Sequence, residues 1–137
     1  MNGFAALQRR LASLSDPRTL AELHNLAGRD VAELVDAGFA GEHDPNGDPW
    51  LPSRAAQKEG RKTLRKIGNL QDGIQWKADS RGVVFQTTGK ANRYARYHQD
   101  GTRRMPQRQF LPEGEIPLPY ERKLVATFRD YFQSRFG

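Results

Sequence analysis

The fold class is decided by one stretch, Ile74-Gln-Trp-Lys-Ala-Asp-Ser-Arg-Gly-Val-Val-Phe-Gln-Thr-Thr88. Its first part alternates apolar and polar side chains, and a period of two predicts a half-buried β-strand. Asp79–Gly82 predicts a turn, because Gly82 can adopt a positive φ. Val83–Thr88 is rich in β-branched residues and predicts the returning strand. The sequence therefore predicts an antiparallel hairpin.

Apolar residues spaced three and four apart predict helices before this hairpin. A short apolar stripe covers residues 4–14. A second helix is expected to begin with Asp16 as N-cap and Pro17 at the first helical position, and to end with Gly41 as C-cap. Gly28 lies inside it, costs about 1 kcal/mol relative to alanine, and predicts a break or a close helix contact.

Three further elements are expected after the hairpin. Residues 91–99 predict a short helix, and Arg108–Leu111 predicts a third, edge-like strand between Pro106 and Pro112. The final helix is amphipathic, with one apolar face formed by Tyr120, Leu124, Phe128, Tyr131 and Phe132. We expect a single α+β domain over residues 1–137, with N-terminal helices, a small antiparallel sheet and the C-terminal helix packed on that sheet.

Composition limits the function classes. A chain of 137 residues with 36% hydrophobic residues predicts a thin core, or a subunit that completes its burial against neighbours. The absence of cysteine excludes a disulfide framework, a thiolate zinc site and a cysteine nucleophile. No apolar run approaches the roughly 18 residues of a membrane span. The first ten residues lack the features of a signal peptide, so we expect a soluble intracellular product without membrane contact.

The formal charge of +6 favours an acidic partner. Residues 41–66 form a basic loop that is expected to be mobile or solvated until a partner binds. Further arginines follow along the chain, and Tyr94 and Tyr97 could stack on bases. No helix-turn-helix, zinc-finger or ribonucleoprotein motif, which would recognise a base sequence, accompanies them. Nonspecific, salt-sensitive contact with DNA and contact with an acidic subunit both stay open.

Asp44-x-Asn46-x-Asp48 has the spacing that opens a calcium loop, but the continuation differs. Pro49 replaces the glycine of the sharp turn, and Ala55 replaces the bidentate glutamate. The alternative is a turn whose Asp and Asn side chains cap their own backbone. In that turn Trp50 would attach the loop to the body of the protein.

An enzyme has little support in the sequence. His24, His43 and His98 lie in no metal-ligand spacing, and no nucleophile elbow, phosphate loop or dinucleotide fingerprint is present. A general base at His98 would need an orienting acid and a nucleophile, and the nearness of Asp100 in sequence does not by itself supply that geometry. We expect no catalytic residue, no metal and no cofactor. A metal-assisted hydrolase built around His98 is the enzyme function that the sequence leaves as an alternative, and it ranks below the functions described next.

Taken together, several segments in one order resemble the tail-completion and virion-morphogenesis family of tailed bacteriophages and prophages, from about Leu34 to Leu111. The order begins with a helix ending at Phe39 and continues through Pro45-Asn-Gly47-x-x-Trp50, Thr63-Leu64, Gly68-Asn-Leu70, the hairpin, Tyr94-Ala-x-x-His98-Gln-x-Gly101 and Met105-Pro-x-Arg108-x-Phe110-Leu. Five weak motifs in this order carry the resemblance.

The resemblance implies a non-enzymatic structural protein at the phage neck or tail end, made in the bacterial cytoplasm. It implies a ring of identical subunits, expected to be a hexamer, that meets tail-tube, tail-terminator or head-connector proteins. A nonspecific DNA-binding accessory protein is the alternative. We expect Trp50 to anchor the Pro45–Gly47 turn. His98 is expected to hydrogen-bond the hairpin or a neighbouring loop, and Arg108 to pair with an acid across an interface. The expected interface or loop anchors are Pro45, Gly47, Trp50, Gly68, Leu70, Tyr94, His98, Gly101, Pro106, Arg108 and Phe110.

Overall fold

The computed structural model describes residues 5, 8–9, 12, 15–60, 63 and 69–136. The apolar residues of the stripe expected over residues 4–14 lie outside this part of the chain. Gly68 also lies outside it. In chain order the elements are α2 (Pro17–Gly41), α3 (Arg54–Glu59), α4 (Asn69–Asp72), β1 (Ile74–Asp79), β2 (Gly82–Thr87), the 3-10 helix η1 (Gly89–Arg93), α5 (Ala95–Asp100) and α6 (Leu118–Phe136).

The long helix α2 begins as the sequence predicts. The Asp16 carboxylate accepts a hydrogen bond from the N–H of Arg18 at 2.9 Å, and Pro17 occupies the first turn. The C-cap is Glu42, not Gly41. Glu42 has a left-handed φ of 56°, and its N–H reaches the carbonyls of the last turn. Its carboxylate also accepts the N–H of Thr63 at 2.7 Å, which helps to hold a non-glycine residue in this conformation.

The hairpin pairs β1 with β2 where the sequence predicts it, and Trp76 lies directly opposite Phe85. Their rings stack with centroids 6.0 Å apart. The Trp76 ring lies on Gly28 of α2, where a Cβ atom would be 2.2 Å from the ring. Gly28 therefore marks neither a break nor a helix–helix contact, because it gives a strand residue room to approach the helix.

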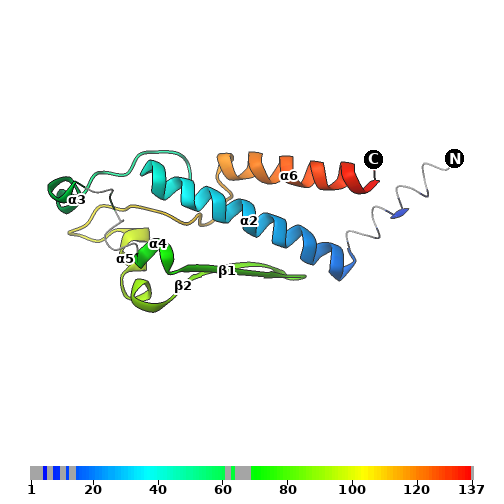
Figure 1. Cartoon of the computed structure of the whole chain (residues 1–137), viewed down its shortest axis with the longest axis horizontal. Helices are drawn as coiled ribbons and strands as arrows, with labels where there is room; N and C mark the ends of the chain where they lie inside the picture. The colour runs from blue at the N-terminus through cyan, green and yellow to red at the C-terminus, as the bar shows by residue number, and fades with distance from the viewer. Residues whose placement is uncertain are drawn as a thin grey trace.

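Figure 1 shows three layers, with α2 between α6 and the hairpin. The α+β class is confirmed, but α6 packs against α2 and not mainly on the sheet. The two helices are joined by ion pairs on one side of α2, between Glu33 and Lys123 and between Glu22 and Arg135. The hairpin packs against the opposite side of α2, so α6 and the hairpin cover different faces of this helix.

The third strand predicted over Arg108–Leu111 does not form, and the sheet has two strands within the described residues. The reason is a competing side chain. Gln99 Oε1 accepts the N–H groups of both Phe110 and Leu111 at 3.1 Å, so neither amide is available for a ladder. The helix predicted over residues 91–99 is present as two pieces, η1 and α5.

The core lies at the C-terminal half of α2, where the long loops meet it. Its buried residues are Val35, Phe39, Trp50, Leu70, Ala91, Ala95, Phe110 and Tyr120. Burial raises the pKa of Tyr120 to about 12, so this side chain anchors the start of α6 as a neutral group. The core therefore sits directly beneath the loops that carry the candidate residues.

Candidate assembly surface

The turn from Asp44 to Asp48 is closed by its own backbone and by one carboxylate. The N–H of Asp44 donates to the carbonyl of Asp48 at 2.8 Å. Oδ1 of Asp44 accepts the N–H groups of Asn46 and Asp48, both at 2.9 Å. Gly47 has a φ of 96° and is exposed, whereas Pro45 is buried. This is the self-capped turn predicted as the alternative to a calcium loop.

Trp50 joins this turn to the segment after α5. Its N–H donates to the carbonyl of Glu42, and its indole Nε1–H donates to the carbonyl of Gln109, both at 2.8 Å. Its ring meets the ring of Phe39 edge-on, with centroids 5.5 Å apart. Trp50 is only 6% exposed, so its ring faces the core and supports the surface from below.

His98 and Arg108 connect α5 to the same segment. The N–H of Arg108 donates to the carbonyl of His98 at 2.8 Å, and the His98 ring lies edge-on to Tyr94. Within the described residues, Nδ1 of His98 is buried without a hydrogen-bond partner. Desolvation, followed by the charge of Arg108, lowers the pKa of His98. The imidazole is therefore neutral at pH 7.

Arg108 is buried, and its Nε–H donates to the carbonyl of Leu51 at 2.7 Å. Burial lowers the pKa of its guanidinium. No carboxylate of residues 15–60 or 69–136 lies within ion-pair distance of it. The acid expected opposite Arg108 is therefore not supplied by this part of its own chain.

Gln99 was not among the residues predicted from the sequence, although it holds the segment after α5. Besides the two amides that it accepts, its Nε2 donates to the carbonyl of Leu111 at 2.6 Å. It acts as a side-chain substitute for a paired strand. The available signal was its position four residues after Ala95, which places both on the buried face of α5.

Gly101 ends α5 at a point where the chain doubles back. Its φ is 76°, and a Cβ atom would lie 2.8 Å from the backbone nitrogen of Gln107. Only glycine combines this conformation with this approach. Gly101 therefore fixes the direction of the loop that leads to Arg108.

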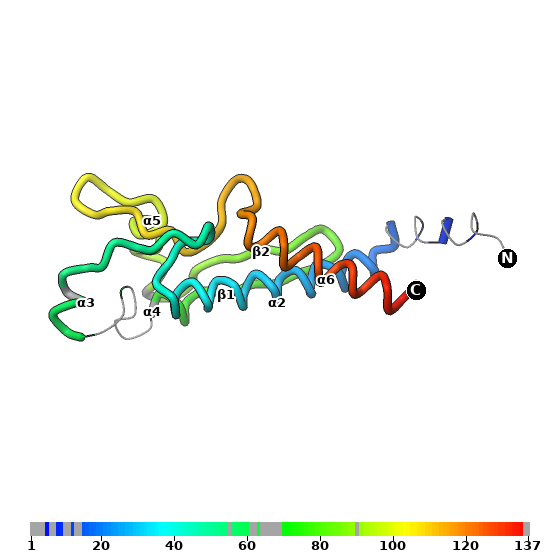
Figure 2. The backbone as a smooth tube through the Cα atoms, turned by 90° about the horizontal axis from the view of Figure 1, so that it is seen from above, coloured from blue at the N-terminus to red at the C-terminus, as the bar shows by residue number. Residues whose placement is uncertain are grey.

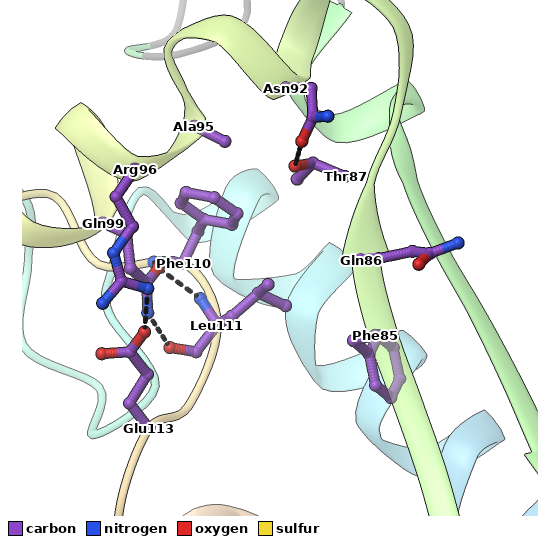
Figure 3. A pocket seen from close by; sticks show the side chains of 10 residues that line it. All are labelled: Phe85, Gln86, Thr87, Asn92, Ala95, Arg96, Gln99, Phe110, Leu111 and Glu113. Atoms are coloured by element: carbon purple, nitrogen blue, oxygen red, sulfur yellow. Dashed lines mark hydrogen bonds and ion pairs between the residues drawn. The ribbon is translucent and has the colours of Figure 1, made fainter.

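A hollow of about 410 Å³ opens between β2, α5 and the segment that follows Phe110 (Figure 3). Phe85, Phe110 and Leu111 contribute apolar side chains to it. At its rim Arg96 bonds to Glu113 and to Asp100, both at 2.7 Å. The side chains of Arg96, Asp100 and Glu113 are exposed by 70%, 44% and 48%, so these ion pairs add little stability.

The outer edge of β2 borders this hollow. The bond from Thr88 N–H to the carbonyl of Gly73 sets the alternation of the ladder. By that alternation, Val83, Phe85 and Thr87 direct their N–H and C=O groups away from β1. None of these groups has a hydrogen-bond partner among the residues that the structure describes. An open strand edge of this kind is suited to pairing with another chain.

The remaining predicted anchors divide between core and surface. Leu70 and Phe110 are buried in the core, and Tyr94 packs against it half-buried. Pro106 is exposed. Gly68 lies outside the described residues. Most of the predicted residues therefore shape the loops beneath the surface, while the surface itself is formed by residues that were not singled out.

Two further features of the described residues bear on the class of site. No group of three or more His, Asp or Glu side chains could hold a metal ion there. The helices in that part are also not long and apolar enough for any to cross a membrane. The described residues offer an open strand edge, a hollow and supported loops, which are the features of a candidate binding surface.

Comparison with known proteins agrees with the resemblance seen in the sequence. The model of the phage virion morphogenesis family matches residues 3–124. No curated protein and no solved structure shows significant similarity. The match covers most of the 137 residues and includes every predicted anchor. The chain belongs to the phage virion morphogenesis family, and its role lies in building the phage virion.

Proposed function

We propose that this chain is a non-enzymatic subunit of a ring, expected to be a hexamer, that completes the phage tail and joins it to the head. The observation that carries the proposal is the open edge of β2 beside the hollow, in a chain of a virion morphogenesis family. A two-stranded sheet is marginal alone, and added strands stabilise it.

A ring needs two different contact surfaces on each subunit, because head-to-tail contacts close only when unlike faces meet. The β2 edge with its hollow supplies one. The outward side of α6 and the residues before it supply a second, with Ile116, Leu118 and Val125 exposed by 60%, 54% and 46%. Leu118 and Val125 are seven residues apart and share one helix face.

The partners in this proposal are other copies of the chain and the tail-tube, tail-terminator or head-connector proteins on either side of the ring. Arg108 supports this assignment. A guanidinium buried against a carbonyl, without a carboxylate in the described part of its own chain, is suited to an acid from a neighbouring subunit. Arginine is also one of the residue types enriched at interfaces.

Loss of the gene in the phage or prophage that encodes this chain tests the function. We expect DNA-filled heads and separate tails in electron micrographs of lysates, with joined virions restored by the gene supplied in trans. Normal virions without the protein would remove the tail-completion role. Heads that fail to form would place its action earlier in assembly.

The contact surface can be tested by Val83→Pro. Proline removes an N–H that points away from β1, so it blocks strand addition while leaving the ladder bonds of the neighbouring residues in place. Val84→Thr is the matched control, because Val84 is exposed on the open face of the sheet. We expect only Val83→Pro to convert the ring to smaller species by native mass spectrometry. Intact rings in both variants would exclude this edge from the contact.

A further inference from the structure

Among the described residues, four exposed cations lie at the end of the molecule away from both termini. We call them the basic end: Arg54 and Lys58 on α3, and Arg103 and Arg104 in the turn between Thr102 and Met105. Figures 1 and 2 both place α3 and the loop after α5 at this end, opposite the N and C labels. The two elements form separate prongs there, as Figure 2 shows from above.

In the part of the chain that the structure describes, no ion pair includes a member of the basic end. Arg81, Arg96, Lys123 and Arg135 each bond to a carboxylate. The only acid of α3 is Glu59. Arg54 and Lys58 are four residues apart on one helix, a spacing at which like charges repel.

The backbone presents these side chains in a defined way. Thr102 and Met105 exchange backbone hydrogen bonds, and the Thr102 hydroxyl accepts the N–H groups of Arg104 and Met105. Gly101 fixes the direction of the turn. On the other prong, the Ser53 hydroxyl caps α3. The hydrogen-bonded turn and the capped helix α3 therefore fix the backbone from which the four exposed cations project.

The neighbouring side chains favour phosphate over a protein surface. Gln57, Thr102 and Gln107 are exposed and polar. The core of a protein interface is apolar and aromatic, whereas a phosphate backbone is bound by cations and polar groups. In the described residues the large exposed apolar side chains lie on β2, α5 and residues 116–125, with Leu51 as the exception near α3.

We propose that the basic end binds the phosphate backbone of double-stranded DNA without reading its sequence. The proposal rests on the proposed neck location, where packaged DNA passes the ring. The helix α3 has only six residues, and no ion pair in the described part of the chain orients any of the four cations. We therefore do not expect these side chains to read base edges. Four cations per subunit predict that the logarithm of the binding constant falls with the logarithm of salt with a slope of about −3 to −4 per subunit engaged.

The test uses full-length protein and a labelled mixed-sequence duplex of about 30 base pairs, followed by fluorescence anisotropy between about 50 and 200 mM salt. The variant carries Arg54→Gln, Lys58→Gln, Arg103→Gln and Arg104→Gln. The control removes the same charge from exposed cations elsewhere, with Arg18→Gln, Lys77→Gln, Arg122→Gln and Arg129→Gln. Arg103→Gln with Arg104→Gln alone gives a variant with no change in any helix.

We expect the four-site variant to bind at least about tenfold more weakly with a shallower salt slope, and the control to stay within about threefold of wild type. Equal losses in both would show that net charge alone acts, and would overturn the proposal. Binding to polyglutamate instead of DNA would assign the basic end to an acidic protein and would also overturn it.

Native mass spectrometry of the same proteins separates this proposal from the proposed function. Rings that persist in the four-site variant while DNA binding is lost would support both. A monomeric wild type that binds DNA through these four residues would contradict the ring while retaining the DNA contact. Wild-type rings that do not bind the duplex would retain the ring and overturn the DNA contact.

Discussion

Replacing Gly28 by alanine tests how the hairpin is seated on α2. An alanine Cβ would lie 2.2 and 2.4 Å from two atoms of the Trp76 ring and 2.9 Å from a third. Overpacking of this kind costs about 1–3 kcal/mol. Alanine in a helix interior returns about 1 kcal/mol relative to glycine. The clash dominates because the Trp76 ring is also stacked on Phe85 and cannot simply turn aside.

We therefore expect Gly28→Ala to lower the free energy of unfolding by about 1 kcal/mol, or the midpoint by roughly 3–4 °C for a chain of this size. Urea and thermal denaturation followed by circular dichroism measure both. Ala37→Gly calibrates the helix contribution, because Ala37 is exposed on the same helix. Adding Trp76→Leu to Gly28→Ala should recover part of the loss.

A Gly28→Ala protein that is more stable than wild type by about 0.5–1 kcal/mol would show that the contact with Trp76 costs no stability, because helix propensity alone would then decide the outcome. Equal effects of alanine in the presence and absence of Trp76 would also contradict it, since the two residues would show no coupling.

Four other predictions follow from named contacts. Trp50→Phe removes the bond to the Gln109 carbonyl and should cost about 1 kcal/mol in urea unfolding; no change would show that the loop is held otherwise. Gly101→Ala should cost more than about 1 kcal/mol, from the positive φ and the contact with Gln107, and a smaller loss would contradict the strained turn. Asp30 is buried on α2, and its Oδ2 has no partner in the described residues, so Asp30→Leu should raise stability by about 1 kcal/mol; a loss would reveal a partner for this carboxylate. Because the folded pKa of His98 lies below 6.5, its neutral form contributes stability that is complete above pH 6.5 and is lost as the pH falls toward the folded pKa; His98→Gln should flatten this part of the stability curve, and an unchanged curve would exclude His98 as its source.

The elements with a local signal were predictable. The N-cap at Asp16 and the period-two pattern of the hairpin depend on neighbours in sequence, and both are present in the structure. The C-cap was wrong by one residue, because Glu42 is held by the distant Thr63. The third strand was wrong because the Gln99 side chain takes its amides, a competition that no propensity expresses.

The sequence predicted the residues that hold the loops of the candidate site, but not the residues exposed on its surface. Aromatic residues beside turns indicated where loops attach, and Trp50 and Phe110 lie in the core that holds them. The edge of β2 is open because no other described strand pairs with it, and a strand pattern in the sequence does not say how many neighbours a strand will have. The basic end forms because two segments about 50 residues apart lie at one end of the fold. Such features arise only when the chain is folded.

Native mass spectrometry of the purified protein in the absence of DNA shows whether the chain forms the proposed ring. A hexameric ring would give one dominant species at six times the chain mass of 15.5 kDa. A monomer that persists across the micromolar range would contradict it.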